Sequence, residues 1–308
     1  MTGVDSTIMK RPDITVIFNP RAGRTSRRYL ASILDLLKEP AMVIETTRPG
    51  HARDIASNMP AGVRLFVAGG DGTINEVVNG LIDARKAGRD IPPMGIIPMG
   101  TANVLAFEIG LDMRPASMMA YLQDGLRTDV RPGLVNGRAF MLMTGVGTDA
   151  QTVADVSPAL KRRIGKWAYV WQGLTTILHG PRRTFSVAID GRAFDAASVI
   201  VTRTIHYAGK YVLSPQSGLA HDNLHVVIMP SLGRKAQLRY ALSLLCGRLA
   251  QQNDVMIVPA TTIIIDANDR HAPLQIDGEA AGGMPTRIGL SEHVITLITP
   301  GPGTANTF

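Results

Sequence analysis

One acidic residue lies among three glycines, where an apolar strand meets a helix. The run is Gly69-Gly70-Asp71-Gly72-Thr73. Without Cβ atoms, backbone N–H groups can approach a phosphate closely, and a helix N-terminus favours negative charge. An acid beside phosphates would repel them unless a cation lies between, so Asp71 indicates chemistry that uses Mg²⁺. The alternative is that Asp71 only caps the helix, as aspartate commonly does.

This glycine turn matches neither of two common phosphate-binding motifs. No Gly-Lys-Ser/Thr follows it, and its spacing is not that of G-x-G-x-x-G. The turn therefore predicts another kind of phosphate site.

Two further acids, Asp277 and Glu279, flank Gly278 after a short apolar run. Taken alone, this stretch predicts a hairpin turn. Surface acids in such a turn need have no catalytic duty. The residues by themselves leave that question open.

The glycine turn lies within a region where short apolar strands alternate with helical stretches. Past the turn, apolar residues recur at i, i+3, i+4, i+7 and i+8, which is the buried stripe of a helix. This alternation over residues 13–130 predicts a doubly wound parallel sheet in an α/β domain. Right-handed crossovers place all strand-to-helix loops at one edge, where such sheets bind ligands. Those loops contain Asn19-Pro20 with Gly23, Thr46 with Gly50-His51-Ala52, the Asp71 turn, and Gly100-Thr101-Ala102-Asn103.

The character of the chain changes near residue 130. Tight turns at Asn136-Gly137 and Asp190-Gly191 predict hairpins, and further short β-rich runs predict a mainly antiparallel β-sandwich. One helix is expected over residues 234–250. We therefore expect a nucleotide-binding domain over residues 1–130 and a β-rich substrate domain over residues 131–287.

Composition supports two globular domains and a partner with negative charge. The 308 residues are 45% hydrophobic and 19% charged, and 32 Lys+Arg against 25 Asp+Glu give a net charge of +7. This charge suits phosphates, nucleic acid or an anionic membrane. Zinc spacings and an RNP-like pattern are absent from the sequence, so specific nucleic-acid binding has little support.

No apolar run is long enough to span a membrane, and residues 1–10 lack the apolar core of a signal peptide. We therefore expect a cytoplasmic protein. Cys246, the single cysteine, lies in an apolar run and is expected to be buried. Residues 161–171 carry four cations followed by Trp167 and Trp171, which suits either a helix at a membrane interface or an ordinary packed helix.

The run from Gly69 to Glu76 resembles the nucleotide-binding signature of the diacylglycerol kinase catalytic domain family, which includes bacterial lipid kinases and sphingosine kinases. NAD kinases and 6-phosphofructokinases resemble it at the same turn. All four loops given above resemble the lipid kinases in order and spacing, and with the stretch that ends at Glu279 the resemblance covers nearly the whole chain, from Asn19 to Glu279. This chain departs from many bacterial members, which have Asp where it has Val104 and Arg where it has Phe107.

The resemblance implies roles for particular residues. Asp71 would organise Mg²⁺, and Glu279, in a Gln-Ile-Asp-Gly-Glu stretch, would take the proton from the lipid hydroxyl. A second Mg²⁺ site would use the carboxylate of Asp222 and the carbonyls of Leu219 and Leu224, although most members have Gly where this chain has Asn223. The residues that would hold ATP are Asn19, Pro20, Gly23, Thr46, Gly69, Gly70, Asp71, Gly72, Thr73, Asn75 and Thr101.

The activity implied is that of an ATP- and Mg²⁺-dependent lipid kinase, a transferase of phospholipid biosynthesis. Diacylglycerol is the favoured acceptor, with phosphatidic acid as product. Sphingosine, ceramide or another lipid alcohol is the first alternative, followed by an NAD kinase-like soluble kinase and by a regulator that binds nucleotide or lipid without turnover. The lipid would enter between the domains, from peripheral contact with the inner membrane surface. A homodimer is left open, and the tail over residues 288–308 is expected to return to the first domain.

Overall fold

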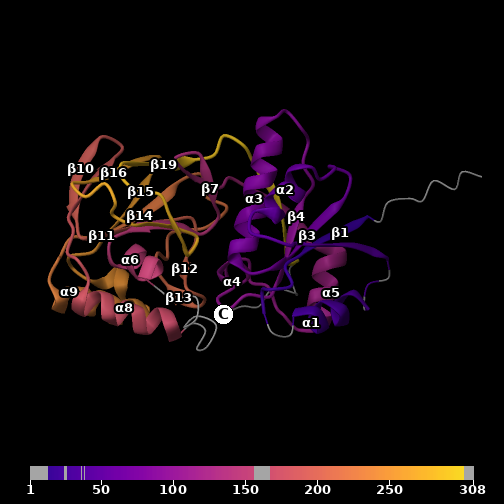
Figure 1. Ribbon diagram of the computed structural model, residues 1–308, viewed down its shortest axis with the longest axis horizontal. Helices are drawn as coiled ribbons and strands as arrows, with labels where there is room; N and C mark the ends of the chain where they lie inside the picture. The colour runs from indigo at the N-terminus through magenta and orange to yellow at the C-terminus, as the bar shows by residue number, and fades with distance from the viewer. Residues whose placement is uncertain (1–12, 24–25, 36, 38, 156–166, 302–308) are drawn as a thin grey trace, which may run out of the picture.

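The computed structural model describes residues 13–23, 26–35, 37, 39–155 and 167–301, with only the backbone at residues 26 and 167–171. Two halves lie side by side (Figure 1), one of mixed α/β structure and one rich in strands. Helix α3 (Asp71–Lys86) lies on the side of the α/β half that faces the strands of the other.

The first half contains a six-stranded sheet in the order β2-β1-β3-β4-β20-β5. Strands β2, β1, β3 and β4 are parallel, as the alternation of strands and helices predicts. Strands β1 and β3 are almost wholly buried because they occupy the centre of the sheet and are apolar on both faces. The bounds are β1 Ile14–Phe18, β2 Ala41–Glu45, β3 Arg64–Gly69, β4 Met94–Pro98, β5 Leu126–Val130 and β20 Ile295–Thr299.

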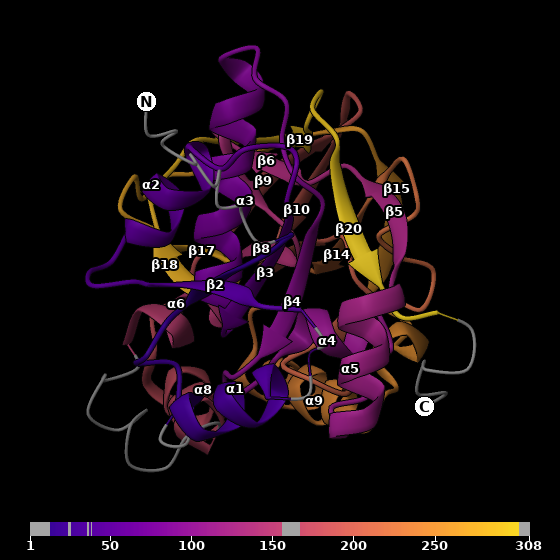
Figure 2. The same ribbon diagram turned by 90° about the vertical axis from the view of Figure 1, so that its right-hand side faces the viewer.

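Helices cover both faces of this sheet (Figures 1 and 2). Helices α2 and α3 pack together on one side, and α1 and α5 on the other. The apolar stripe of α3 is at most 3% exposed, so the spacing read from the sequence does mark its buried face. The bounds are α1 Ser26–Leu34, α2 His51–Ser57, α4 Val104–Glu108 and α5 Pro115–Asp124.

The second half is a sandwich of two six-stranded sheets, which confirms the predicted fold class. Their orders are β10-β9-β16-β19-β6-β7 and β15-β14-β11-β8-β17-β18. Aliphatic residues of both sheets form one core cluster between them. The strands are β6 Gly133–Val135, β7 Arg138–Phe140, β8 Met143–Val146, β9 Phe185–Ile189, β10 Arg192–Ala196, β11 Ser198–Thr202, β14 Leu224–Met229, β15 Met256–Ala260, β16 Thr262–Ala267, β17 Leu274–Ile276, β18 Glu279–Ala281 and β19 Thr286–Leu290.

Smaller elements complete this half. A two-stranded sheet joins β12 (His206–Tyr207) and β13 (Tyr211–Val212). Helices α6 (Thr148–Asp155), α8 (Trp167–His179) and α9 (Arg234–Leu245) accompany the sandwich, and a 3₁₀ turn covers Leu249–Gln251. Helix α9 and this turn occupy the region where the sequence predicts one helix.

The predicted hairpins form with the predicted turn chemistry. Asn136 and Asp190 have φ of 48° and 45°, and each precedes a glycine with φ of 85°. Two successive positive φ angles define the type I′ turn, whose twist matches that of the flanking strands. Asp277 and Gly278 form a third such turn, with φ of 49° and 80°, between β17 and β18.

The last strand of the described chain returns to the first sheet. Strand β20 pairs in parallel with β4 and antiparallel with β5, and Figure 2 shows it among strands from the start of the chain. The Tyr121 hydroxyl helps to hold it, since it donates to the Ile298 carbonyl at 3.1 Å and accepts from the Ile96 N–H at 2.8 Å. Ile288, where the sequence prediction begins this tail, still lies in β19 of the sandwich, so the chain crosses back after Leu290.

Two further predictions concern Cys246 and the cationic segment with its two tryptophans. Cys246 is exposed, because it is the C-cap residue of α9, whose Leu242 and Leu245 also face outward; the prediction that it is buried is wrong. The cationic segment 161–166 and the side chains of Trp167 and Trp171 lie outside the described residues. None of the described helices is long and apolar enough to cross a membrane.

Candidate active site

The loops that follow β1, β3 and β4 meet at one edge of the first sheet. A Cβ atom on Gly100 would lie 2.7 Å from the Cα of Gly70, so these two turns touch backbone to backbone. A Cβ atom on Gly23 would lie 3.0 Å from the Met99 carbonyl oxygen. The separation at Gly100 is shorter than a side-chain carbon tolerates, and the one at Gly23 is tight, so the small size of glycine lets the three loops approach this closely.

Side chains of the predicted nucleotide site reinforce this convergence. Asn19 donates from Nδ2 to Thr73 Oγ1 at 2.8 Å, and its Oδ1 accepts from the Arg21 N–H at 2.9 Å. A Cβ atom on Gly69 would lie 2.7 Å from the Thr73 Cβ, so that glycine leaves room for Thr73. The Asn19 loop is therefore fixed to the first turn of α3, and Pro20 lies in the same turn.

Two predicted threonines lie in neighbouring loops. Thr46 follows β2, and its N–H donates to the Phe18 carbonyl at 2.8 Å, which continues the pairing of β2 with β1. Thr101 follows Gly100 and is exposed. Both remain predicted contacts to nucleotide.

Asp71 begins α3, but its carboxylate caps a different helix. It accepts the N–H groups of Val104 at 3.2 Å and Leu105 at 3.4 Å, at the start of α4. Burial raises the pKa of Asp71, and these N–H groups act in the opposite direction. A carboxylate is also the kind of oxygen ligand that Mg²⁺ prefers. Asp71 therefore fits a Mg²⁺ ion that enters with a nucleotide.

Glu279 reaches the same turn from the other half of the molecule. A Cβ atom on Gly72 would lie 2.5 Å from Oε1 of Glu279, so the carboxylate rests against the glycine next to Asp71. Arg138 donates from Nη2 to Glu279 Oε2 at 3.1 Å and fixes the other oxygen. The Glu279 side chain is 52% exposed, so it is accessible to a substrate. Arg138 was not predicted from the sequence.

A buried clasp, also missed by the sequence analysis, joins the two halves beside Glu279. The Asp277 carboxylate accepts the Asn75 amide at 2.8 Å and the N–H groups of Met141, Leu142 and Met143 at 2.9 to 3.0 Å. Burial raises the pKa of Asp277 to about 6. The type I′ turn that contains Asp277 thus anchors the strand that carries Glu279.

Asn75 belongs to this clasp rather than to an open nucleotide site. It is 2% exposed, and its amide also donates to the Ala139 carbonyl at 2.9 Å. One turn later, Asn79 bonds the same residue through the Ala139 carbonyl at 3.0 Å and the Ala139 N–H at 2.9 Å. A direct contact of the Asn75 side chain with ATP would require these bonds to break. The i, i+4 spacing of two asparagines on the buried side of α3 was the available signal.

Two residues of the predicted second Mg²⁺ site, Leu219 and Asp222, have other partners in this structure. The Leu219 carbonyl accepts Arg203 Nη2 at 2.6 Å. The Asp222 side chain is 83% exposed and lies 3.9 Å from Arg131 Nε, while Leu224 begins β14. Among the described residues, no group of three or more His, Cys, Asp or Glu could hold a metal.

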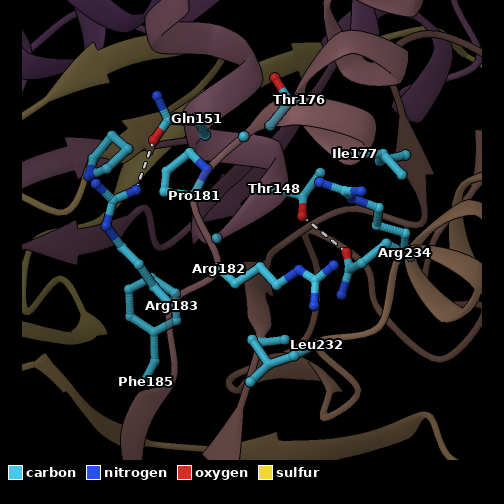
Figure 3. Close-up of a pocket in the computed structure, with 15 residues that line it drawn as sticks. Thr148, Gln151, Thr176, Ile177, Pro181, Arg182, Arg183, Phe185, Leu232 and Arg234 are labelled. Carbon is cyan, nitrogen blue, oxygen red and sulfur yellow. Dashed lines mark hydrogen bonds between the residues drawn. The ribbon is translucent and has the colours of Figure 1, made fainter.

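A pocket in the second half draws on other residues (Figure 3). Side chains of α6, the end of α8 and the start of α9 line it. Within it, Thr148 Oγ1 donates to Gln237 Oε1 at 2.8 Å, and Arg183 Nη1 donates to Gln151 Oε1 at 2.8 Å. It contains none of the site residues predicted from the sequence, so we place the candidate site at the glycine turns.

Comparisons with known proteins match both halves of the chain. The diacylglycerol kinase catalytic domain family matches residues 13–135, and the YegS C-terminal NAD kinase beta sandwich-like domain matches residues 142–299. The first match contains the glycine turns and Asp71. The second contains Asp277 and Glu279.

Similar proteins span nearly the whole chain. A diacylglycerol kinase of Bacillus subtilis is 29% identical over 93% of this chain and 95% of its own. A probable lipid kinase YegS-like of Pseudomonas aeruginosa is 33% identical over 71% of this chain and 72% of its own. A crystal structure of a putative diacylglycerol kinase from Bacillus anthracis has the same fold, with a TM-score of 0.70 at 23% identity over 94% of this chain and 98% of that one. The chain therefore belongs to the diacylglycerol kinase catalytic domain family and is a lipid kinase.

Proposed function

We propose that this protein transfers the γ-phosphoryl group of ATP to the hydroxyl of diacylglycerol and forms phosphatidic acid. The observation that carries the proposal is the contact of Glu279 with Gly72, next to Asp71. The acceptor oxygen forms a bond to the γ-phosphorus as the bond to the β,γ-bridging oxygen breaks. The hydroxyl proton passes to Glu279, and ADP leaves.

The glycine turns supply the phosphate site in this proposal. Gly70 is the N-cap residue of the sixteen-residue helix α3 and Gly72 lies in its first turn, where backbone N–H groups and the dipole favour anions, while Gly69 ends β3 directly before them. Phosphoryl transfer has a loose transition state, so placement and charge neutralisation provide most of the catalysis. Mg²⁺ bound with the nucleotide would supply that neutralisation, with Asp71 as its protein ligand. Arg138 would keep Glu279 aimed at the acceptor.

A direct assay separates the candidate reactions. The protein is incubated with γ-labelled ATP and Mg²⁺, and with mixed micelles of diacylglycerol, ceramide or sphingosine, or with soluble NAD. We expect label in phosphatidic acid. Label in ceramide or sphingosine phosphate would keep the mechanism and change the acceptor. Label only in NADP would make the protein a soluble kinase, and no transfer to any acceptor would favour a regulator.

Gly72→Ala tests the position of Glu279 without touching either acid. The new methyl group would lie 2.5 Å from Glu279 Oε1, so the flexible carboxylate must move away while the backbone stays in place. We expect kcat to fall by about 10²-fold, because a shift of about 1 Å costs that much. Steady-state kinetics with ATP and diacylglycerol, together with thermal unfolding, measure the effect.

Gly62→Ala is the matched control, because nothing lies within 4 Å of the added atom. It should retain the wild-type kcat. If Gly72→Ala were equally active, Glu279 would not act from its place beside this turn.

We further propose that the α8–α9 face contacts the membrane. Helices α8 and α9 lie beside each other along one end of the second half (Figure 1). Leucines on and beside them are exposed, and Arg234 and Lys235 begin α9. Apolar side chains next to cations suit the interface of an anionic bilayer such as the inner membrane surface. The leucines are Leu174, Leu178, Leu232, Leu238, Leu242 and Leu245.

Leu242→Glu should lower the fraction of protein that sediments with phosphatidylglycerol vesicles several-fold, because it places a negative charge against the lipid. Leu126→Glu, at another exposed leucine on β5, is the control and should bind like the wild type. Equal sedimentation of both variants would remove this face from the proposal. A homodimer that loses its partner in Leu242→Glu, seen by light scattering, would assign the face to a second copy instead.

A further inference from the structure

Arg203 is a buried cation in the part of the chain where the family resemblance placed a metal. It follows β11, it is 1% exposed, and it is the largest of the fully buried side chains. Burial lowers the pKa of Arg203 to about 10, so the guanidinium is still charged at neutral pH. A buried charge is costly unless its surroundings compensate for it.

The compensation comes from backbone carbonyls of one loop. Arg203 Nη1 donates to the carbonyls of His221 at 2.5 Å and Asn223 at 2.7 Å, and Nη2 donates to the Leu219 carbonyl at 2.6 Å. A charged donor shortens and strengthens such bonds. Three carbonyl oxygens therefore converge on a single positive group within a stretch of five residues.

Acids contribute to this cation only from a distance. Asp222 and Glu108 both act to raise the pKa of Arg203, but each carboxylate pairs with another residue. Asp222 lies 3.9 Å from Arg131 Nε, and Glu108 accepts the N–H groups of Ile205 and His206. The carbonyl set, rather than an ion pair, thus holds the guanidinium.

Converging carbonyl oxygens beside one carboxylate are also the ligand set of a hard divalent cation. In this structure the group at the centre of the three carbonyls of Leu219, His221 and Asn223 is the Arg203 guanidinium, which is itself a cation. We propose that Arg203 is a built-in substitute for the divalent ion at this loop. The loop is then held in its fold by the polypeptide alone and needs no bound Mg²⁺.

Arg203 is also connected through hydrogen bonds to the interdomain clasp around Asp277. The Arg203 N–H donates to the Leu142 carbonyl at 2.8 Å, and the Leu142 N–H bonds to Asp277 in the interdomain clasp. The loop, Arg203 and the clasp therefore form one connected backbone network that ends two residues before Glu279. An arginine in place of an exchangeable ion makes this support independent of the metal concentration.

Metal binding without nucleotide tests the proposal and needs no activity. Metal-free wild-type protein is titrated with Mn²⁺ and followed by electron paramagnetic resonance, alongside Asp222→Asn. We expect the two titrations to be the same, and we expect EDTA or Mg²⁺ to leave the thermal midpoint of the wild type unchanged. A Mn²⁺ site in the wild type that Asp222→Asn abolishes would overturn the proposal. Asp71→Asn identifies any binding that belongs to the glycine turn.

Removing the guanidinium gives the converse result. Arg203→Gln should lower the thermal midpoint by on the order of 10 °C, since three carbonyls lose their cation. Mg²⁺ or Ca²⁺ should restore part of this loss, and Asp222→Asn in the same background should cancel the recovery. A loss that no divalent ion restores would overturn the substitution and leave Arg203 a packing residue. Arg131→Gln, at the exposed partner of Asp222, is the control and should show neither effect. If Arg203→Gln does not fold, the wild-type titration decides.

Discussion

Glu279→Gln is expected to lower kcat for lipid phosphorylation by about 10²- to 10⁴-fold, the range typical of losing a positioned base. Glutamine keeps the size of the side chain and can still accept a hydrogen bond from Arg138, but it cannot take a proton at neutral pH. The KM for ATP should change little, because the proposed role of Glu279 is to take the proton of the acceptor hydroxyl, and the glutamine side chain keeps the same size beside Gly72. Initial rates with diacylglycerol micelles give both constants.

Glu292→Gln provides the matched control for this substitution, because Glu292 is exposed and lies between β19 and β20. It should have wild-type kinetics, and both variants should unfold at the wild-type temperature. Full turnover by Glu279→Gln would remove Glu279 from the chemistry. Of the two acids proposed for catalysis, only Asp71 would then remain.

Asp71→Asn should reduce kcat/KM by about 10²- to 10⁴-fold, since a metal-held phosphate is worth several kcal/mol in the transition state. The amide oxygen can still accept one of the two N–H groups at the start of α4, so the loop is retained while the charge is lost. The variant should need a higher Mg²⁺ concentration for half-maximal rate. A titration of Mg²⁺ at fixed ATP measures this shift.

Unfolding separates the catalytic role of Asp71 from its capping role. Burial raises the pKa of Asp71, so its ionised form is not favoured by the fold, and loss of the charge should cost little stability. Asp35→Asn, at an exposed acid past α1, should be neutral in both assays. A variant Asp71→Asn that unfolds early but retains full turnover would show that Asp71 serves only as a cap.

Local signals predicted most of the fold. The glycine turns, the stripe of α3 and the Asn136-Gly137 hairpin each depend on residues close in sequence, whose backbone preferences survive in any context. The meeting of the strand-to-helix loops at one edge followed from crossover geometry. Both the first sheet and the sandwich could be predicted because these rules need only residues that are close in the sequence.

The contacts between the halves could not be predicted, because the sequence does not show which loops meet in space. Nothing near Asp277 indicates that its carboxylate receives Asn75 and three N–H groups, and nothing near Arg203 indicates a ring of carbonyls. The helix that Asp71 caps is α4 and not its own, which the sequence did not indicate, while its role in binding Mg²⁺ stays a prediction. Cys246 was expected to be buried because of its apolar neighbours, and only the packing of α9 reveals that this side is exposed.

Strand β20 lies between β4 and β5 of the first sheet, although it is made almost last. Its Ile295 and Leu297 are fully buried among residues from the beginning of the chain. On a ribosome, the nucleotide half must therefore wait for the sandwich to be synthesised before its own sheet can close. After a protease cut between the halves, this strand would still hold the two fragments together, because it lies between β4 and β5. Neither half is therefore an independent domain.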